Sequence, residues 1–302
     1  MRDFHFALVL FLVPILLSGC VSSPPSSDRI VVTASIFPLA DIAENIGGDL
    51  VSVEVLIPPG ASPHVFEPNP EAFRKFSESR LFVMVGAGLE FWAEKLITAT
   101  ADETLVVIRA AQGVSLIQMD GRSHEHDHGH LPEGNPHVWL DPAVAKSLAQ
   151  RIAEALMLLD RKHAREYRDR LSAYEQRLDT LDRTIRQTVE SFRITEYVAF
   201  HPAWSYFARR YGLVEVGVIQ ESPGREPTPK HFQEIIQAIE QYEIKAVFAE
   251  PQLNPVAAAV IASEADVEVL ILDPLGGPDL PGRDCYIGLM EHNLKVMKEA
   301  MQ

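Results

Sequence analysis

Three histidines and one aspartate each follow a short apolar, β-branched segment of the kind that forms a buried strand. In sheets of parallel strands, ligands bind just outside the carboxyl ends of the strands. Imidazole nitrogens joined by one carboxylate are a donor set suited to tetrahedral zinc. These positions therefore predict a zinc site whose metal ligands are His64, His137, His201 and Asp273.

Taken one at a time, these residues have ordinary structural explanations. A lone histidine after a strand is more often a hydrogen-bonded structural residue, and an aspartate before proline, such as Asp273, is usually a turn residue. Their shared placement at strand ends favours the metal site. By contrast, His163, His231 and His292 fall on predicted helices and are interpreted as structural or solvent-facing.

A histidine-rich run at residues 123–130 precedes His137 and gives a second metal signal. Its histidines alternate with Glu125, Asp127 and Gly129, a composition typical of a weak metal collector. Ordering so many polar residues around an ion costs conformational entropy, so the tight site is not expected there. The run is interpreted as an accessory metal loop made of His124, His126, His128 and His130.

Length and charge narrow the class of protein. The chain has 302 residues, enough for two domains with ample cores. Its net charge is −15 at pH 7, which argues against a nucleic-acid partner and is compatible with cation binding.

Strand and helix patterns alternate in both halves of the chain, which predicts an α/β protein built from parallel βα units. In the first half, strands are predicted at 30–35, 51–57, 81–85 and 104–108, and helices at 39–46, 70–77, 90–99 and from Pro142 onward. In the second half, strands are predicted at 197–200, 214–219, 245–248 and 267–272, and helices at 204–211, 229–242, 255–265 and 286–301. Two similar lobes would leave one crevice between them.

Between the two halves, residues 143–200 contain neither Gly nor Pro, and apolar residues recur at steps of three and four along 161–191. This spacing predicts one amphipathic helix of 31 residues, roughly 46 Å long. The same stripe is also typical of a coiled-coil dimer. Because βα units stand on both sides, we favour a rigid strut that joins two lobes of a monomer.

The N-terminus predicts an exported protein. Residues 4–17 are apolar, and Leu17-Ser18-Gly19-Cys20 follows them, which is typical of a lipoprotein signal whose Cys20 carries lipid after cleavage. An uncleaved transmembrane anchor is the alternative, although the apolar run is shorter than the roughly 20 residues that a spanning helix needs. Residues 21–29 then form a tether, and Cys285 is left without a disulfide partner.

The segments around the candidate ligands resemble the zinc/manganese solute-binding proteins of ABC transporters. The resemblance runs from about Ile30 to the C-terminus, and its motifs occur in the same order as in the family. Three of these motifs contain the candidate histidines: Ser-Pro-His-Val-Phe-Glu-Pro at 62–68, Asn-Pro-His-Val-Trp-Leu-Asp-Pro at 135–142 and His-Pro-Ala-Trp-Ser-Tyr-Phe at 201–207. The other two are Glu-Pro-Gln at 250–252 and Asp-Pro-Leu-Gly at 273–276. It implies two four-stranded α/β lobes bridged by one long helix, with the metal buried between them. It also implies His64, His137, His201 and Asp273 as ligands, and a membrane permease as the partner that receives the metal.

With this resemblance, the expected organisation has five parts. They are a signal peptide at 1–20, a tether at 21–29, an N-terminal lobe at 30–160, a bridging helix at 161–191 and a C-terminal lobe at 192–302. The protein is expected on the outer face of the cytoplasmic membrane, held there by its lipid. Glu250 and Glu221 are candidates to accept a hydrogen bond from a ligand histidine.

The choice of metal depends on His201. Imidazole favours zinc, whereas a carboxylate at this position goes with manganese-type members of the resembling family. Zinc binding is expected to weaken as the pH falls toward the ordinary histidine pKa of about 6.5. The alternatives are a manganese or iron receptor of the same type, a secreted zinc-dependent hydrolase, and an adhesin with a structural metal. An enzyme is disfavoured because four protein ligands would leave no open position for water.

Overall fold

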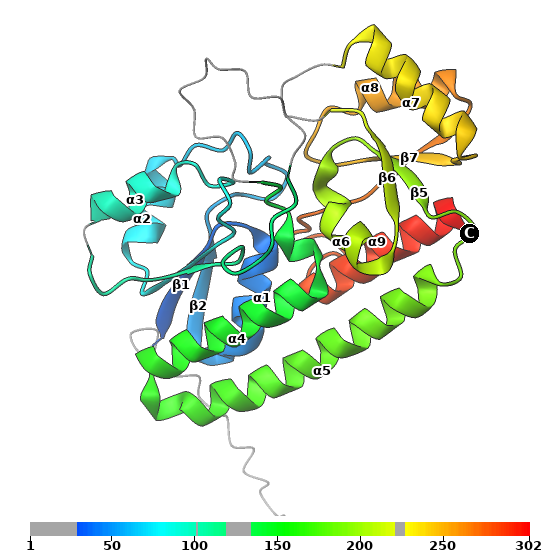
Figure 1. Ribbon diagram of the computed structural model, residues 1–302. Helices are drawn as coiled ribbons and strands as arrows, with labels where there is room; N and C mark the ends of the chain where they lie inside the picture. The colour runs from blue at the N-terminus through cyan, green and yellow to red at the C-terminus, as the bar shows by residue number, and fades with distance from the viewer. Residues whose placement is uncertain (1–28, 101, 119–133, 221–226) are drawn as a thin grey trace, which may run out of the picture.

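The chain folds into two α/β lobes, each built on a four-stranded parallel sheet (Figure 1). The computed structural model describes residues 29–100, 102–118, 134–220 and 227–302. The strand orders are β2-β1-β3-β4 and β6-β5-β7-β8, so the second sheet repeats the topology of the first. The predicted architecture is confirmed.

In the N-terminal lobe, strands and helices alternate as the sequence predicts. The strands are β1 (Ile30–Ala34), β2 (Val51–Val55), β3 (Leu81–Met84) and β4 (Val106–Arg109). The helices are α1 (Phe37–Gly47), α2 (Pro70–Ser77), α3 (Ala93–Thr100) and α4 (Pro142–Leu159), with the short 3-10 turns η2 (Gly48–Leu50) and η3 (Val138–Leu140).

The C-terminal lobe follows the same plan. Its strands are β5 (Glu196–Ala199), β6 (Val214–Val218), β7 (Ala246–Ala249) and β8 (Glu268–Ile271). Its helices are α6 (Ser205–Tyr211), α7 (Pro229–Gln241), α8 (Val256–Glu264) and α9 (Tyr286–Met301), and the 3-10 turn η5 (Pro202–Trp204) precedes α6.

Burial explains why these short segments form strands. The inner strands β3 and β7 are buried along their whole length, whereas the edge strands β2 and β8 are only partly covered. Strands buried on both faces need continuous apolar sequence, as Leu-Phe-Val-Met and Ala-Val-Phe-Ala provide. One apolar cluster runs from Val32 and Phe82 in the first lobe to Phe248 and Met290 in the second, so the lobes share a core.

Proline after a capping side chain fixes the start of three helices. Asn69, Asp141 and Thr228 each accept a backbone N–H two or three residues ahead, and each is followed by proline. The cap at Asp141 matters for function, since it fixes the end of the loop that carries His137.

The bridging helix is α5 (Ala164–Val189), 26 residues and roughly 39 Å long. It is shorter than predicted because Arg161–His163 form a separate 3-10 turn, η4, and the α-helix ends at Val189. The apolar stripe is buried against the same chain, in contacts with α4, α1 and α9. The coiled-coil dimer interpretation is therefore wrong, because Tyr174, Leu178 and Ile185 have no exposed face to offer a partner.

Figure 1 shows α5 running antiparallel beside α4 under the first lobe and then passing below the second. The last helix, α9, begins beside the first lobe, where the Tyr286 backbone N–H donates to Asp41, and it runs in the same direction as α5 and in contact with it toward the C-terminus. Within the part of the chain that the structure describes, no helix combines the length and apolarity needed to cross a bilayer.

The unbroken helix and the shared core lead us to expect little movement between the lobes. The protein's radius of gyration should be the same with and without zinc, because any change should be confined to loops or a small tilt. Small-angle X-ray scattering of the zinc-free and zinc-loaded protein measures this directly. A clear compaction on zinc binding would contradict a rigid frame.

Candidate metal centre

Three imidazoles from the two lobes meet in the crevice. Nε2 of His64 lies 3.1 Å from Nε2 of His137 and 3.2 Å from Nε2 of His201. One ligand nitrogen from each ring lies within 4.8 Å of the other two. Nitrogens bound to tetrahedral zinc at ~2.05 Å are about 3.3 Å apart. The structure therefore brings three of the four predicted ligands together at the spacing that zinc requires.

Each histidine follows the end of a strand, as predicted. Beyond β2, the backbone of Leu56 and Ile57 still pairs with Ala34 and Ser35, and this pairing directs the chain toward His64. His201 comes two residues after β5 and immediately before η5. His137 immediately precedes η3.

Asn135 fixes the orientation of the His137 ring. Its side-chain Oδ1 accepts hydrogen bonds from the backbone N–H of His137, at 3.0 Å, and from Nδ1 of the same residue, at 2.8 Å. Because Nδ1 donates, Nε2 carries the free electron pair and faces the other two histidines. Sequence reasoning proposed glutamates for this role and missed Asn135, although an Asn two residues before a ligand can form a local turn.

The same asparagine ties the two lobes together. Its Nδ2 donates to the carbonyl of Pro202, at 2.6 Å, and lies 3.2 Å from the hydroxyl of Ser205. Tyr206 adds a third link, since its hydroxyl donates to the Asn135 carbonyl at 2.6 Å. The loop that carries His137 is thus bonded to the segment that follows His201.

Burial keeps the imidazoles neutral. It lowers the pKa of His64 to about 4, and burial together with the charge of His64 lowers the pKa of His201 to about 3. The pKa of His137 lies well below its usual range, first because of burial and then because of His201 and His64. Protons are therefore expected to compete with a metal for these nitrogens at a lower pH than the ordinary histidine pKa of about 6.5.

Asp273 is buried but does not belong to the group of three histidines. Its Oδ2 accepts a hydrogen bond from Nη1 of Arg283 at 2.8 Å. Its Oδ1 accepts from Nε2 of Gln252 and from the backbone N–H groups of Leu275 and Gly276, at 2.9 to 3.0 Å. The fourth predicted ligand is thus held by its own lobe.

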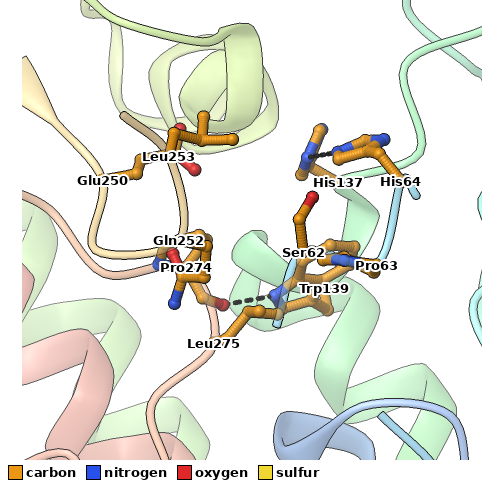
Figure 2. Close-up of a pocket in the computed structure, with 10 residues that line it drawn as sticks. All are labelled: Ser62, Pro63, His64, His137, Trp139, Glu250, Gln252, Leu253, Pro274 and Leu275. Carbon is orange, nitrogen blue, oxygen red and sulfur yellow. Dashed lines mark hydrogen bonds between the residues drawn. The ribbon is translucent and has the colours of Figure 1, made fainter. Parts of the chain in front are cut away.

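A cavity of about 10 Å³ lies beside His64 and His137, which is room for about one water-sized body. Figure 2 shows these histidines facing Glu250, Gln252 and Pro274 across it. The carboxylate oxygen Oε1 of Glu250 is buried and has no hydrogen-bond partner among the described residues. Burial, with the charges of Asp273 and Glu215, raises the pKa of Glu250 well above its usual range. Glu250 is near the site, but the hydrogen bond to His137 is made by Asn135.

Some predicted residues lie outside the part of the chain that the structure describes. They are the lipidation residue Cys20, the accessory histidines His124, His126, His128 and His130, and Glu221. Cys285 is free, and its Sγ accepts the Gly288 backbone N–H at the start of α9.

The three histidines lie in a chain that matches a known protein family. The model of the family described as the periplasmic component A of the zinc-uptake complex, ZnuA, matches residues 32–300. The chain belongs to this family. The match includes both lobes and all four predicted ligands, so the ZnuA-type fold found here is the one that the family resemblance implied.

The similar proteins include some whose names refer to zinc and one whose name refers to manganese. The zinc-binding lipoprotein AdcA of Streptococcus pneumoniae is 28% identical over 97% of this chain, which spans 60% of the length of that relative. The manganese-binding lipoprotein MntA of Halalkalibacterium halodurans is 25% identical over 97% of both chains. A zinc-bound crystal structure of a ZnuA deletion variant is 32% identical, covers 91% of this chain and 99% of its own, and has a TM-score of 0.80.

The lowered pKa values make the stability of the zinc-free protein depend on pH. In the unfolded chain these histidines take up protons below pH 6.5, whereas in the folded protein His64 does so only near pH 4. The free energy of unfolding should therefore fall as the pH drops from 6.5 to 4, by up to about 1.4 kcal/mol per pH unit for each histidine. Urea unfolding of the zinc-free protein at several pH values measures this slope.

The matched control is His64→Asn, which removes one titrating ring from the site. Its slope should be shallower than that of the unchanged protein, while the contribution of the buried carboxyl groups stays the same. Equal dependence of the free energy of unfolding on pH in the two proteins would contradict a lowered pKa of His64.

Proposed function

We propose that this protein is the extracytoplasmic zinc receptor of an ABC uptake transporter and delivers the ion to the transporter's permease. The observation that carries the proposal is the meeting of three neutral imidazoles from two lobes, two of them buried and that of His64 partly buried, at zinc-ligand spacing. Membership of the zinc-uptake family supports it, as do the names of the relatives. The chain covers only part of AdcA, so the activity is argued from the site itself.

In this proposal the ion is a cargo held by side chains of both lobes. His64 and His137 bind it from the first lobe, and His201 binds it from the second. Asp273 remains the predicted fourth ligand, and its carboxylate would offset part of the charge of the ion. Asn135 holds the His137 ring so that Nε2 points at the ion without any change of tautomer.

The donor set favours zinc over manganese. Three imidazoles bind zinc well, whereas manganese prefers carboxylate, carbonyl and water oxygens. Because one relative is named as manganese-binding, a manganese receptor is the alternative function. A manganese receptor would be expected to replace at least one ring nitrogen with an oxygen donor, and the position to test is His201.

Replacing His201 with Glu should weaken zinc binding by more than about tenfold, since even losing an outer hydrogen-bond partner of a ligand costs that much. The same change should improve manganese binding relative to zinc, because it supplies a harder oxygen donor. Competitive titration of both proteins with zinc and manganese at pH 7 measures both effects. His231→Glu adds the same charge outside the group and should leave both affinities unchanged. Equal affinity of the unchanged protein for the two metals would defeat the zinc assignment.

A secreted zinc hydrolase fits the residues less well. The metalloprotease motif His-Glu-x-x-His occurs once, at His124 to His128. However, residues 123–130 contain no apolar side chain that could anchor a buried catalytic helix. The run is better explained as the accessory collector that its composition predicts.

Lipidation at Cys20 is proposed to hold the receptor on the outer face of the membrane. The Leu-Ser-Gly-Cys sequence and the Ser- and Pro-rich tether after it support this. Cys20→Ala should abolish labelling with a radioactive fatty acid and should leave the signal peptide uncleaved. Cys285→Ala, which changes the other cysteine, should do neither. Normal processing of Cys20→Ala would rule out a lipoprotein signal.

A further inference from the structure

Arg283 and Asp273 form the only ion pair of the described residues in which the carboxylate is fully buried. The guanidinium Nη1 lies 2.8 Å from Oδ2 of Asp273, and the arginine side chain keeps 23% of its surface exposed. Charge-assisted hydrogen bonds of this kind are among the stronger contacts in proteins. Any ion that recruits Asp273 must therefore compete with an existing cation.

The two oxygens of Asp273 are held differently. Oδ1 accepts three hydrogen bonds, two of which come from the backbone of the turn that follows it. Oδ2 accepts one, from Arg283. A metal can thus take Oδ2 without disturbing the turn, provided that the arginine yields.

Asp273 lies immediately behind the wall of the cavity. Its neighbours Pro274 and Leu275 line the cavity, and so does Gln252, which is bonded to Oδ1 (Figure 2).

The loop that carries Arg283 is folded back onto the aspartate turn. The backbone N–H of Gly277 donates to the Arg283 carbonyl at 3.1 Å, and that of Arg283 donates to the Leu280 carbonyl at 2.8 Å. Gly276 has a φ of +65°, and a Cβ there would lie 2.5 Å from the Arg283 carbonyl oxygen. Only glycine permits this approach, so the position of Arg283 beside Asp273 is built into the loop.

We propose that Arg283 sets the zinc affinity of the receptor by holding Asp273 away from the three histidines until the ion displaces it. The inference rests on the proposed function and on Asp273 as fourth ligand. In the zinc-free protein the arginine neutralises a buried carboxylate. When zinc binds, Oδ2 exchanges the guanidinium for the metal, and the partly exposed arginine turns to solvent. Affinity is then lower than three imidazoles and a free carboxylate would give, which suits a receptor that must release its cargo.

The test is a double-mutant cycle on zinc affinity, measured by competition with a chromogenic chelator at pH 7. Arg283→Gln should tighten zinc binding about tenfold, since one charge-assisted hydrogen bond no longer has to be broken. Asp273→Asn should weaken binding. In the Asp273→Asn background, adding Arg283→Gln should have no further effect. Arg283→Lys keeps the charge and should stay close to the unchanged protein.

A second readout separates this role from a merely structural one. Arg283→Gln leaves a buried carboxylate without its cation, so the melting temperature of the zinc-free protein should drop. Zinc should restore it, because the ion takes the place of the arginine. The cobalt-substituted protein should show the intense visible bands of four-coordinate cobalt, and Asp273→Asn should change them.

Three results would overturn the proposal. Weaker zinc binding by Arg283→Gln would mean that the arginine presents Asp273 to the metal. Equal tightening in the Asp273→Asn background, or in the exposed-charge control Arg74→Gln, would mean a general effect of charge. Unchanged zinc binding by Asp273→Asn together with a loss in Glu250→Gln would give the fourth position to Glu250. If the unchanged protein and every variant lack tight zinc binding, the proposed function itself fails.

Discussion

Convergence of three uncharged imidazoles, two of them buried, at one point of the crevice is the constraint on which the rest of the structure depends. A buried imidazolium without a partner is costly, so the rings must be neutral, and their free nitrogens must converge on something that replaces water. The rings come from two lobes, so their convergence at 3.1 to 3.2 Å requires the lobes to be fixed relative to each other. The site is therefore only as well defined as the junction between the lobes.

That junction is made by hydrogen bonds close to the ligands and by helices far from them. Asn135 binds the second lobe at Pro202, and the Trp139 indole donates to the Pro274 carbonyl at 2.8 Å. Tyr286, at the start of α9, donates to the Trp139 carbonyl, and its backbone N–H donates to Asp41. Opening the crevice would expose these buried polar groups as well as the shared core. Loops at the crevice are the parts that can move at lower cost.

What could be predicted from the sequence was local. The strand patterns placed His64, His137 and His201 beyond the carboxyl ends of strands, and the structure has them there, because the parallel strands of one sheet bring their carboxyl ends to the same edge. The predicted start of α4 at Pro142 was equally local, because the side chain of Asp141 caps it. What could not be predicted depends on how the lobes pack. The contact of Asn135 with Pro202 and the contact of α5 with α9 join residues far apart in the sequence, and no pattern in the sequence identifies the partner in either contact. The pairing of Asp273 with Arg283 was missed for a different reason, because a carboxylate that follows a strand looks the same whether a metal or an arginine faces it.

Charge explains why such a site can be stable without its cargo. Three neutral imidazoles carry no charge, and Asp273 is neutralised by Arg283. Burial raises the pKa of Glu250, which favours its uncharged form beside the cavity. The zinc-free crevice is thus close to neutral, so little buried charge is left uncompensated. A divalent ion then meets imidazole nitrogens that need no deprotonation. As its positive charge arrives, Glu250 can lose a proton and Asp273 can exchange its ion pair with Arg283 for the metal. The polar groups behind the three histidines adjust the charge of the site, while the histidines supply its geometry.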